Sequence, residues 1–176
     1  MTHMNRFAAA AMLLALAACQ SPSASSTAGA NPADARFITD AYQIIEFDRQ
    51  EGQLARTEAK DPRVKALAAK LTSEANEYAA RIAPLAAQAG IRPPSVLRND
   101  LRVRLGHMRL QNGLDFDRTY LDDQIASHEE VVLSESAMTP QEHSPPLMGV
   151  ARSALDLIRQ NLAELRALRQ QIGPGR

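Results

Sequence analysis

The sequence predicts an all-α protein, an antiparallel four-helix bundle, and three observations support this prediction. Four long segments place apolar residues at steps of three and four, which is the repeat of an amphipathic helix. Capping residues, prolines and glycines stand at the ends of these segments, where helices begin and end. The chain is also rich in Ala, Leu, Arg, Gln and Glu and contains no Trp, three Tyr and four Phe, a composition typical of helices.

The expected helices cover residues 32–60, 61–90, 113–138 and 144–173. The first two begin at Asn31-Pro32 and Asp61-Pro62, where a capping side chain precedes a proline at the first helical position. A Ser-Pro pair opens the fourth helix in the same way, and Asp115 is a candidate cap for the third. At roughly 1.5 Å per residue these helices are about 35 to 42 Å long, which suits a bundle.

Each expected helix has one apolar face, and these faces would form the core. The predicted core positions are Ala41, Ile45, Gly52, Ala55 and Ala59 in the first helix, Val64, Leu67, Leu71, Tyr78, Ile82 and Leu85 in the second, Leu121, Ile125 and Val132 in the third, and Val150, Ala154, Leu157, Leu165 and Leu168 in the fourth. The tight turn between the first two helices predicts a hairpin. The long connection between the second and third leaves open whether they run parallel or antiparallel.

Residues 1–18 resemble a bacterial export signal. A charged start is followed by a run that is almost all Ala, Leu and Met. The run ends in Leu16, Ala17 and Ala18 before Cys19, which resembles a lipobox, the motif whose cysteine is acylated after the preceding peptide is removed. We therefore expect Cys19 to carry lipid. The apolar run itself is too short to cross a bilayer, because crossing takes roughly 20 apolar residues.

The rest of the chain divides into three parts. Residues 19–31 are rich in Ser and Ala and form a flexible tether, residues 32–172 form the helical domain, and residues 173–176 form a tail. Cys19 is the only cysteine, so acylation leaves no thiol for a disulfide or for nucleophilic catalysis. Several acyl chains on one cysteine would hold the domain durably at a membrane.

Charge is nearly balanced after the signal is removed. Of 20 basic and 20 acidic residues in the whole chain, only one basic residue lies in the signal, which argues against a nucleic-acid partner. The sequence has no phosphate-binding loop, no nucleophile elbow and no Cys/His cluster. We expect a cell-envelope protein that faces the periplasm. Gln20 after the cysteine, where inner-membrane lipoproteins carry Asp, favours the outer membrane.

Polar residues interrupt the apolar faces near the helix midpoints. Continuing the helical spacing places Asp48, Ala75, His128 and Asn161 on the inner faces of the first, second, third and fourth helices. These four positions should share one layer. A carboxylate, an imidazole and a carboxamide inside a bundle are the groups from which metal sites are built.

Two segments resemble a known family. GQLARTEAKDPRVKALAAKL (52–71) and FDRTYLDDQIASHEEVV (116–132) are similar to the ferritin-like "domain of unknown function 4142" family of bacterial outer-membrane lipoproteins. The resemblance covers about residues 36–168, and its most specific piece is the Phe-Asp-x-x-Tyr-Leu run before His128. It implies a ferritin-like bundle of unproven activity with acid and histidine positions facing inward.

Only part of the family's inner pattern is kept. His128 matches the histidine of the third helix, and Asp48 stands where the family usually has glutamate. Ala75 and Asn161 stand where the family usually presents histidine. No helix carries a Glu-x-x-His pair, which diiron bundles use to hold two metals, so the sequence argues against a diiron centre.

Two interpretations of this layer remain open. Asp48, His128 and Asn161 could hold a single divalent metal ion, completed by an acid such as Glu51 or Glu135, although zinc sites usually have three or four protein ligands. Alternatively, the three side chains satisfy one another and fix the helix register, because an unpaired buried polar group costs about 1 to 3 kcal/mol. We expect no cofactor other than this metal ion.

The connection between residues 90 and 115 should contain a short helix, because apolar residues recur there at helical spacing at Val96, Leu97, Leu101, Leu105 and Met108. It is also basic, with one acid, Asp100, among Arg92, Arg98, Arg102, Arg104 and Arg109. Two interpretations of these arginines remain open. They form a patch that binds anionic lipid headgroups or an envelope polymer, or they form a solvated face neutralised by acids such as Glu129 and Glu130.

Two functions are therefore considered. The first is a non-enzymatic, membrane-tethered module that acts through an envelope protein or polymer, and the loss of ligands from the inner layer favours it. The alternative is a ferritin-like metal-binding or redox protein that uses an incomplete site, and the shared layer of Asp48 and His128 favours that.

Overall fold

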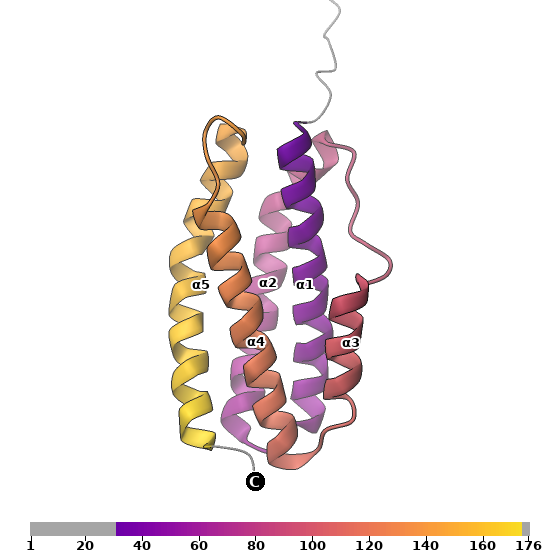
Figure 1. The fold of residues 1–176 in the computed structure, drawn as a ribbon, viewed down its shortest axis with the longest axis vertical. Helices are drawn as coiled ribbons and strands as arrows, with labels where there is room; N and C mark the ends of the chain where they lie inside the picture. The colour runs from indigo at the N-terminus through magenta and orange to yellow at the C-terminus, as the bar shows by residue number, and fades with distance from the viewer. Residues whose placement is uncertain (1–30, 174–176) are drawn as a thin grey trace, which may run out of the picture.

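The computed structural model of the protein describes residues 31–173. This part of the chain folds into five helices and no strand (Figure 1): α1 (Pro32–Glu58), α2 (Pro62–Gln88), α3 (Asn99–Met108), α4 (Gly113–Ser136) and α5 (Pro145–Ile172). The four long helices form a bundle, and α3 lies in the long connection. The predicted all-α bundle with a short connector helix is confirmed. Within the described range, no helix combines the length and apolar character needed to cross a membrane.

The helix directions answer the question that the long connection left open. In Figure 1, α1 and α5 run one way and α2 and α4 run the other. The closest packing is within the α1–α2 and α4–α5 hairpins, and α1 also contacts α4 while α2 contacts α5. The chain after α2 returns along the outside of the bundle, so α2 and α4 run parallel. Each of the four long helices is antiparallel to the long helices that it contacts. A single long crossover of this kind is the ferritin-like connectivity.

Of the four predicted helix caps, two make the expected side-chain hydrogen bond; Ser144 is the N-cap residue of α5, but its side chain makes no capping hydrogen bond. Asn31 Oδ1 accepts a hydrogen bond from Ala33 N at 2.9 Å, and Asp61 Oδ1 accepts one from Arg63 N at 2.8 Å. The prediction for Asp115 is wrong. The helix begins two residues earlier, at Gly113 with its positive φ, so Asp115 lies inside the first turn.

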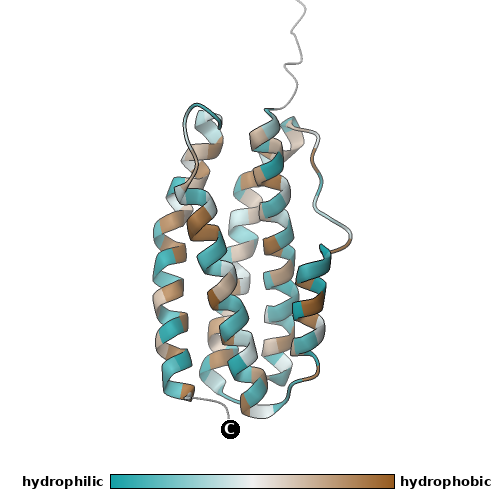
Figure 2. Cartoon of the chain, viewed as in Figure 1, coloured by the Kyte–Doolittle hydropathy of each residue, from teal (hydrophilic) through white to brown (hydrophobic). Residues whose placement is uncertain are grey.

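The apolar faces of the helices meet in three clusters. Figure 2 shows hydrophobic and hydrophilic residues alternating along every long helix, as the helical repeat requires. One cluster lies near the α1–α2 turn, one near the start of α1, and a third between α3 and α1. Their central residues are Leu67, Phe116, Tyr120 and Leu165 in the first, Ile38, Tyr42, Ile82 and Leu147 in the second, and Ile44, Phe47, Leu101 and Leu105 in the third.

Two apolar residues assigned to helix faces lie at the surface instead. Val96 is 61% exposed because it precedes α3, which begins only at Asn99, so helical spacing does not apply to it. Leu157 is 38% exposed and borders the cavity described next.

Candidate functional site

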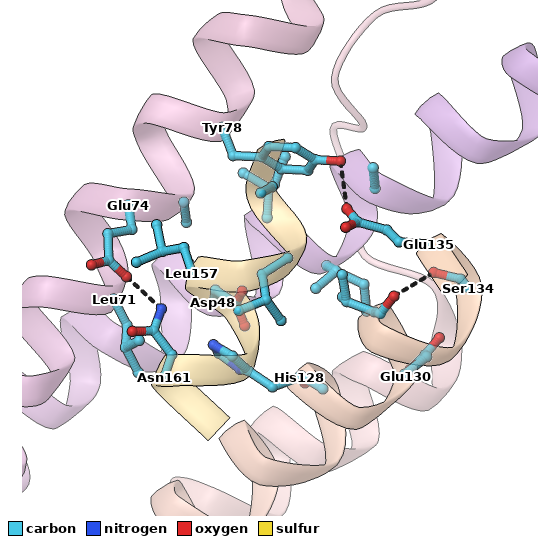
Figure 3. A pocket seen from close by; sticks show the side chains of 18 of the residues that line it. Asp48, Leu71, Glu74, Tyr78, His128, Glu130, Ser134, Glu135, Leu157 and Asn161 are labelled. Atoms are coloured by element: carbon cyan, nitrogen blue, oxygen red, sulfur yellow. Dashed lines mark hydrogen bonds between the residues drawn. The ribbon is translucent and has the colours of Figure 1, made fainter. Parts of the chain in front are cut away.

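A cavity of 230 Å³ lies between the two hairpins, and all four long helices line it (Figure 3). It is in the half of the bundle nearer the start of α1, between the first two core clusters. Its apolar wall includes Ile44, Ile45, Leu71, Ala154, Leu157 and Ile158. Its polar lining includes Asp48, Glu74, Tyr78, His128, Glu135 and Asn161.

The four positions of the predicted inner layer all line this cavity. Asp48 comes from α1, Ala75 from α2, His128 from α4 and Asn161 from α5. No hydrogen bond joins the three polar members among the described residues. The interpretation that they satisfy one another is therefore wrong, because each has partners outside the set.

The partner of Asp48 is Gln124, one turn before His128 on α4. Gln124 Nε2 donates to Asp48 Oδ1 at 3.0 Å and to Glu51 Oε2 at 2.9 Å, so one amide bridges two carboxyl groups of α1. Glu51 is completely buried, and its Oε1 has no partner in the described part of the chain. Burial raises the pKa of Glu51 well above its usual value, and Asp123 and Asp48 add to the effect by like-charge repulsion. The neutral, protonated form of Glu51 is therefore favoured by its surroundings.

Asp48 is half-buried because it borders the cavity. Desolvation raises its pKa to about 7, although the Gln124 hydrogen bond and the charge of Arg104 both act to lower it. Near neutral pH, Asp48 therefore exchanges readily between its protonated and ionised forms. A cation in the cavity would favour the ionised form.

His128 presents one ring nitrogen to the backbone and leaves the other for the cavity. Its Nδ1 lies 2.9 Å from the carbonyl oxygen of Gln124. Since a carbonyl can only accept, we assign the proton to Nδ1, which leaves Nε2 with an acceptor lone pair. Burial lowers the pKa of His128, and nearby Lys70 lowers it further, so the neutral ring is the dominant form.

Glu135 forms the second carboxyl group of the cavity wall. Tyr78 donates its hydroxyl to Glu135 Oε1 at 2.8 Å, as Figure 3 shows. The other oxygen, Oε2, is buried and has no partner among the described residues. Desolvation raises the pKa of Glu135 to about 7, against the opposing effects of the Tyr78 hydrogen bond and the charge of Arg81. Glu135 thus keeps one unused acceptor.

Both polar groups of the Asn161 side chain are hydrogen-bonded to other side chains. Its Nδ2 donates to Glu74 Oε2 at 2.5 Å, and its Oδ1 accepts from Lys70 Nζ at 3.0 Å. Lys70 also bonds Glu164 at 2.5 Å. The amide oxygen that a metal would need therefore already faces an ammonium group.

The four positions of the predicted layer do not assemble a metal site among the described residues. Asp48 and His128 provide two suitable donors, Ala75 provides none, and the oxygen of Asn161 is occupied by Lys70. Across residues 31–173, no three His, Cys, Asp or Glu side chains are grouped so that they could hold a metal. Two protein ligands fall short of the three or four that zinc sites usually have.

Two of the four arginines of the predicted anionic-surface patch are paired with acids. Arg98 contacts Glu130 at 2.8 Å, Asp100 at 3.0 Å and Asp40 at 3.7 Å. Arg104 bonds Asp123 at 3.0 Å, and its guanidinium lies 4.6 Å from the centre of the Phe47 ring. These two arginines hold α3 to α1 and α4.

The remaining arginines of the connection are exposed. Arg102 bonds Asn99 at 2.9 Å, while Arg92 and Arg109 form no ion pair within the described residues. Of the acids expected to neutralise the patch, Glu130 does so through Arg98, but Glu129 pairs with Arg166 on α5 instead. A patch for an anionic surface would therefore depend on Arg102 and Arg109.

Sequence reasoning missed Gln124 as a member of the site. It lies four residues before His128 and so on the same face of α4, which is the signal that could have identified it. The sequence pattern presents Glu135, two turns after His128, only as an acid that could complete a metal site, and Tyr78 only as an apolar position. Their mutual hydrogen bond shows that both belong to the polar wall.

Several predicted features lie outside the described residues. These are the signal at 1–18 with Leu16, Ala17 and Ala18, the lipid attachment residue Cys19, most of the tether at 19–31 and most of the tail at 173–176. Lipid attachment at Cys19 therefore stays a prediction from the sequence.

Comparison with known proteins identifies the family. The family described as "Domain of unknown function (DUF4142)" matches residues 19–168. A solved structure of a DUF305 fragment from Deinococcus radiodurans superimposes with a TM-score of 0.68 at 15% sequence identity, covering 81% of this chain and 99% of that one. At that identity the likeness concerns the fold alone. No curated protein matches the chain. Because the family match covers most of the chain, including every helix that lines the cavity, this protein belongs to the DUF4142 family.

Proposed function

We propose that the chain is a lipid-anchored protein of the periplasmic face, at the outer membrane, whose bundle is a non-enzymatic binding module. The observation that carries the binding role is the cavity between the hairpins, where a small ligand would bind. Ligand sites are typically concave and mostly apolar, with a few placed polar groups, and this cavity has that composition.

Small residues in the wall of the cavity support a role for it. Protein interiors are close-packed, and larger side chains at Ala75 or Ala154 would fill this space. The small residues there leave room for a ligand.

The position of the cavity also suits a tethered protein. About 12 residues separate Cys19 from Asn31 in the sequence, and such a segment spans at most about 40 Å when extended. An acylated Cys19 would therefore keep the start of α1 near the membrane. The cavity lies in that half of the bundle, so its ligand would be met close to the membrane surface.

Binding of a neutral aromatic probe tests the cavity directly. We would titrate benzyl alcohol into the purified full chain carrying Cys19→Ser and follow the side-chain methyl signals by NMR. Signals of Ile44 and Ile158 in the cavity wall should shift, while that of Ile125, outside the cavity lining, should not. The variant Ala154→Leu should abolish the shifts, and Ala163→Leu, at an exposed position of the same helix, should keep them. Shifts that persist in Ala154→Leu, or that are absent from the wild type, would contradict the proposal.

A further inference from the structure

Carboxyl groups dominate the charged lining of the cavity. Six acids border it, namely Asp40, Asp48, Glu74, Glu77, Glu130 and Glu135. Only two arginines do, Arg81 and Arg98, and Arg98 already contacts three carboxylates. The charge of the lining therefore favours a positively charged ligand.

The unused hydrogen-bonding capacity of the lining consists of acceptors. Glu135 is only 6% exposed, so its Oε2 cannot rely on bulk solvent, and this oxygen has no hydrogen-bond partner among the described residues. Asp48 uses Oδ1 for Gln124, and His128 uses Nδ1 for a backbone carbonyl. Asp48 Oδ2 and His128 Nε2 have no hydrogen bond from any residue in the described range. A ligand that pairs with any of these groups must bring donors, and an ammonium group has donors and no acceptor.

We infer that the cavity binds a small organic ammonium compound with an apolar body, whose charge is balanced by Asp48 and Glu135. The inference rests on the proposed function and specifies its ligand class. Burial of two acids without a cation is unfavourable, which is why the pKa of each is raised to about 7. A bound ammonium group lowers that penalty and favours the ionised form of the acid that it approaches.

The cavity limits the size of the ligand. An engineered cavity of about 150 Å³ in another protein holds a benzene molecule. The volume of 230 Å³ therefore suits a body of roughly ten non-hydrogen atoms. The aliphatic walls that would contact this body come from all four long helices and include Ile44 and Ile45 from α1, Leu71 from α2, Val131 from α4 and Ile158 from α5.

Lys70 determines which end of the cavity the cation occupies. Its ammonium group bonds Asn161 and Glu164, and its charge also lowers the pKa of His128, so a ligand ammonium group in this corner would meet a like charge. The ammonium group is therefore placed away from Asn161, toward Asp48 and Glu135. Replacing either acid should weaken the binding of an ammonium compound and spare that of a neutral one.

Three aromatic probes of similar size, one cationic, one neutral and one anionic, separate the effect of charge from that of size. Benzylamine, benzyl alcohol and benzoate would be titrated by calorimetry at pH 8 into the full chain carrying Cys19→Ser. Benzylamine, protonated at this pH, should bind about tenfold more tightly than benzyl alcohol, and benzoate should bind more weakly than both. Asp48→Asn and Glu135→Gln should each lower the affinity for benzylamine about fivefold without affecting benzyl alcohol. Glu129→Gln, outside the cavity lining on the same helix as Glu135, is the matched control and should leave both affinities unchanged.

The outcomes distinguish this inference from the proposed function. Equal affinity for benzylamine and benzyl alcohol, or tighter binding of benzoate, overturns the ligand class and leaves the binding module intact. Benzylamine binding that is unchanged in both Asp48→Asn and Glu135→Gln overturns the assignment of these acids. Failure of all three probes to bind overturns the proposed function as well. Both replacements keep the shape of the side chain, and circular dichroism confirms that each variant is folded before titration.

Discussion

The buried carboxylate of Asp117 accepts a hydrogen bond from the backbone N–H of Lys60 at 2.8 Å, joining the start of α4 to the turn between α1 and α2. Its second oxygen accepts from Asp61 N at 2.9 Å. Phe116 and Tyr120 on either side are buried as well. The Phe-Asp-x-x-Tyr-Leu run that carries the family resemblance therefore stabilises the junction of the two hairpins and does not contribute to the cavity.

Asp117→Ala should lower the free energy of unfolding by about 2 to 4 kcal/mol, because it leaves two backbone N–H groups without partners beside a buried site. Urea unfolding followed by circular dichroism measures this loss. Asp156→Ala, at an exposed position of α5, is the control and should change the free energy by less than about 0.5 kcal/mol. An equal effect of the two substitutions would show that Asp117 does not hold the junction.

The architecture could be predicted because its signals are local. Capping residues and prolines fix the helix starts, and a step of three or four residues places Asp48 and His128 on inner faces. The role of Asp117 could not be predicted, since its partner Lys60 is 57 residues away in the sequence. The cavity escaped prediction for a similar reason, because its volume depends on how far apart the two hairpins pack.

The close approach of α1 and α2 at Gly52 gives a second prediction. A Cβ atom at Gly52 would lie 2.1 Å from Thr72 Oγ1. Gly52→Ala should therefore destabilise the bundle by about 1 to 3 kcal/mol through overpacking, although alanine is the better helix former. The double variant Gly52→Ala/Thr72→Ala removes the clashing oxygen and should recover most of the loss in thermal unfolding. Without such a recovery, steric conflict with Thr72 could not be the cause.

The raised pKa of Asp48 makes stability depend on pH. Its pKa is about 7 in the folded state and 3.8 ordinarily, so the folded protein binds the Asp48 proton more tightly than the unfolded chain does. The stability that this gives is complete below pH 3.8 and is lost as the pH rises to about 7. Asp48→Asn removes this loss and should be more stable than the wild type at pH 8 by about 1 to 3 kcal/mol, with little difference at pH 4. Urea unfolding at pH 4 and at pH 8 measures this difference in the free energy of unfolding.

Other groups around Asp48 also titrate, so the wild type and Asp48→Asn must be compared with each other at each pH. Glu51 from α1 also has a raised pKa, whereas the pKa of His128 from α4 is lowered, so His128 favours the folded state more as the pH rises. Arg104 of α3 and Gln124 of α4 act on Asp48 in both experiments. Asp156→Asn on the surface of α5 is the control. A wild type at least as stable as Asp48→Asn at pH 8 would mean that burial of Asp48 is not unfavourable.

The donor set of the cavity predicts a weak response to metals. Because the described residues hold no group of three His, Cys, Asp or Glu side chains around one point, added Zn²⁺, Mn²⁺ or Fe²⁺ should raise the melting temperature of the wild type no more than that of His128→Ala. Thermal unfolding with and without each ion measures this, and element analysis of the purified chain complements it. A stabilisation of the wild type that His128→Ala abolishes would establish a metal site and favour the ferritin-like alternative.

The proposed function depends most on lipid attachment at Cys19, and mass spectrometry of the N-terminal peptide measures it most directly. The full chain would be expressed in a bacterium that processes lipoproteins, and its membrane fraction would be analysed beside that of Cys19→Ser. We predict that the mature protein begins at Cys19, carries acyl chains on that residue and sediments with membranes, and that Cys19→Ser does none of these. A wild-type chain that is recovered without lipid, or that remains soluble after processing, would contradict the membrane-tethered module.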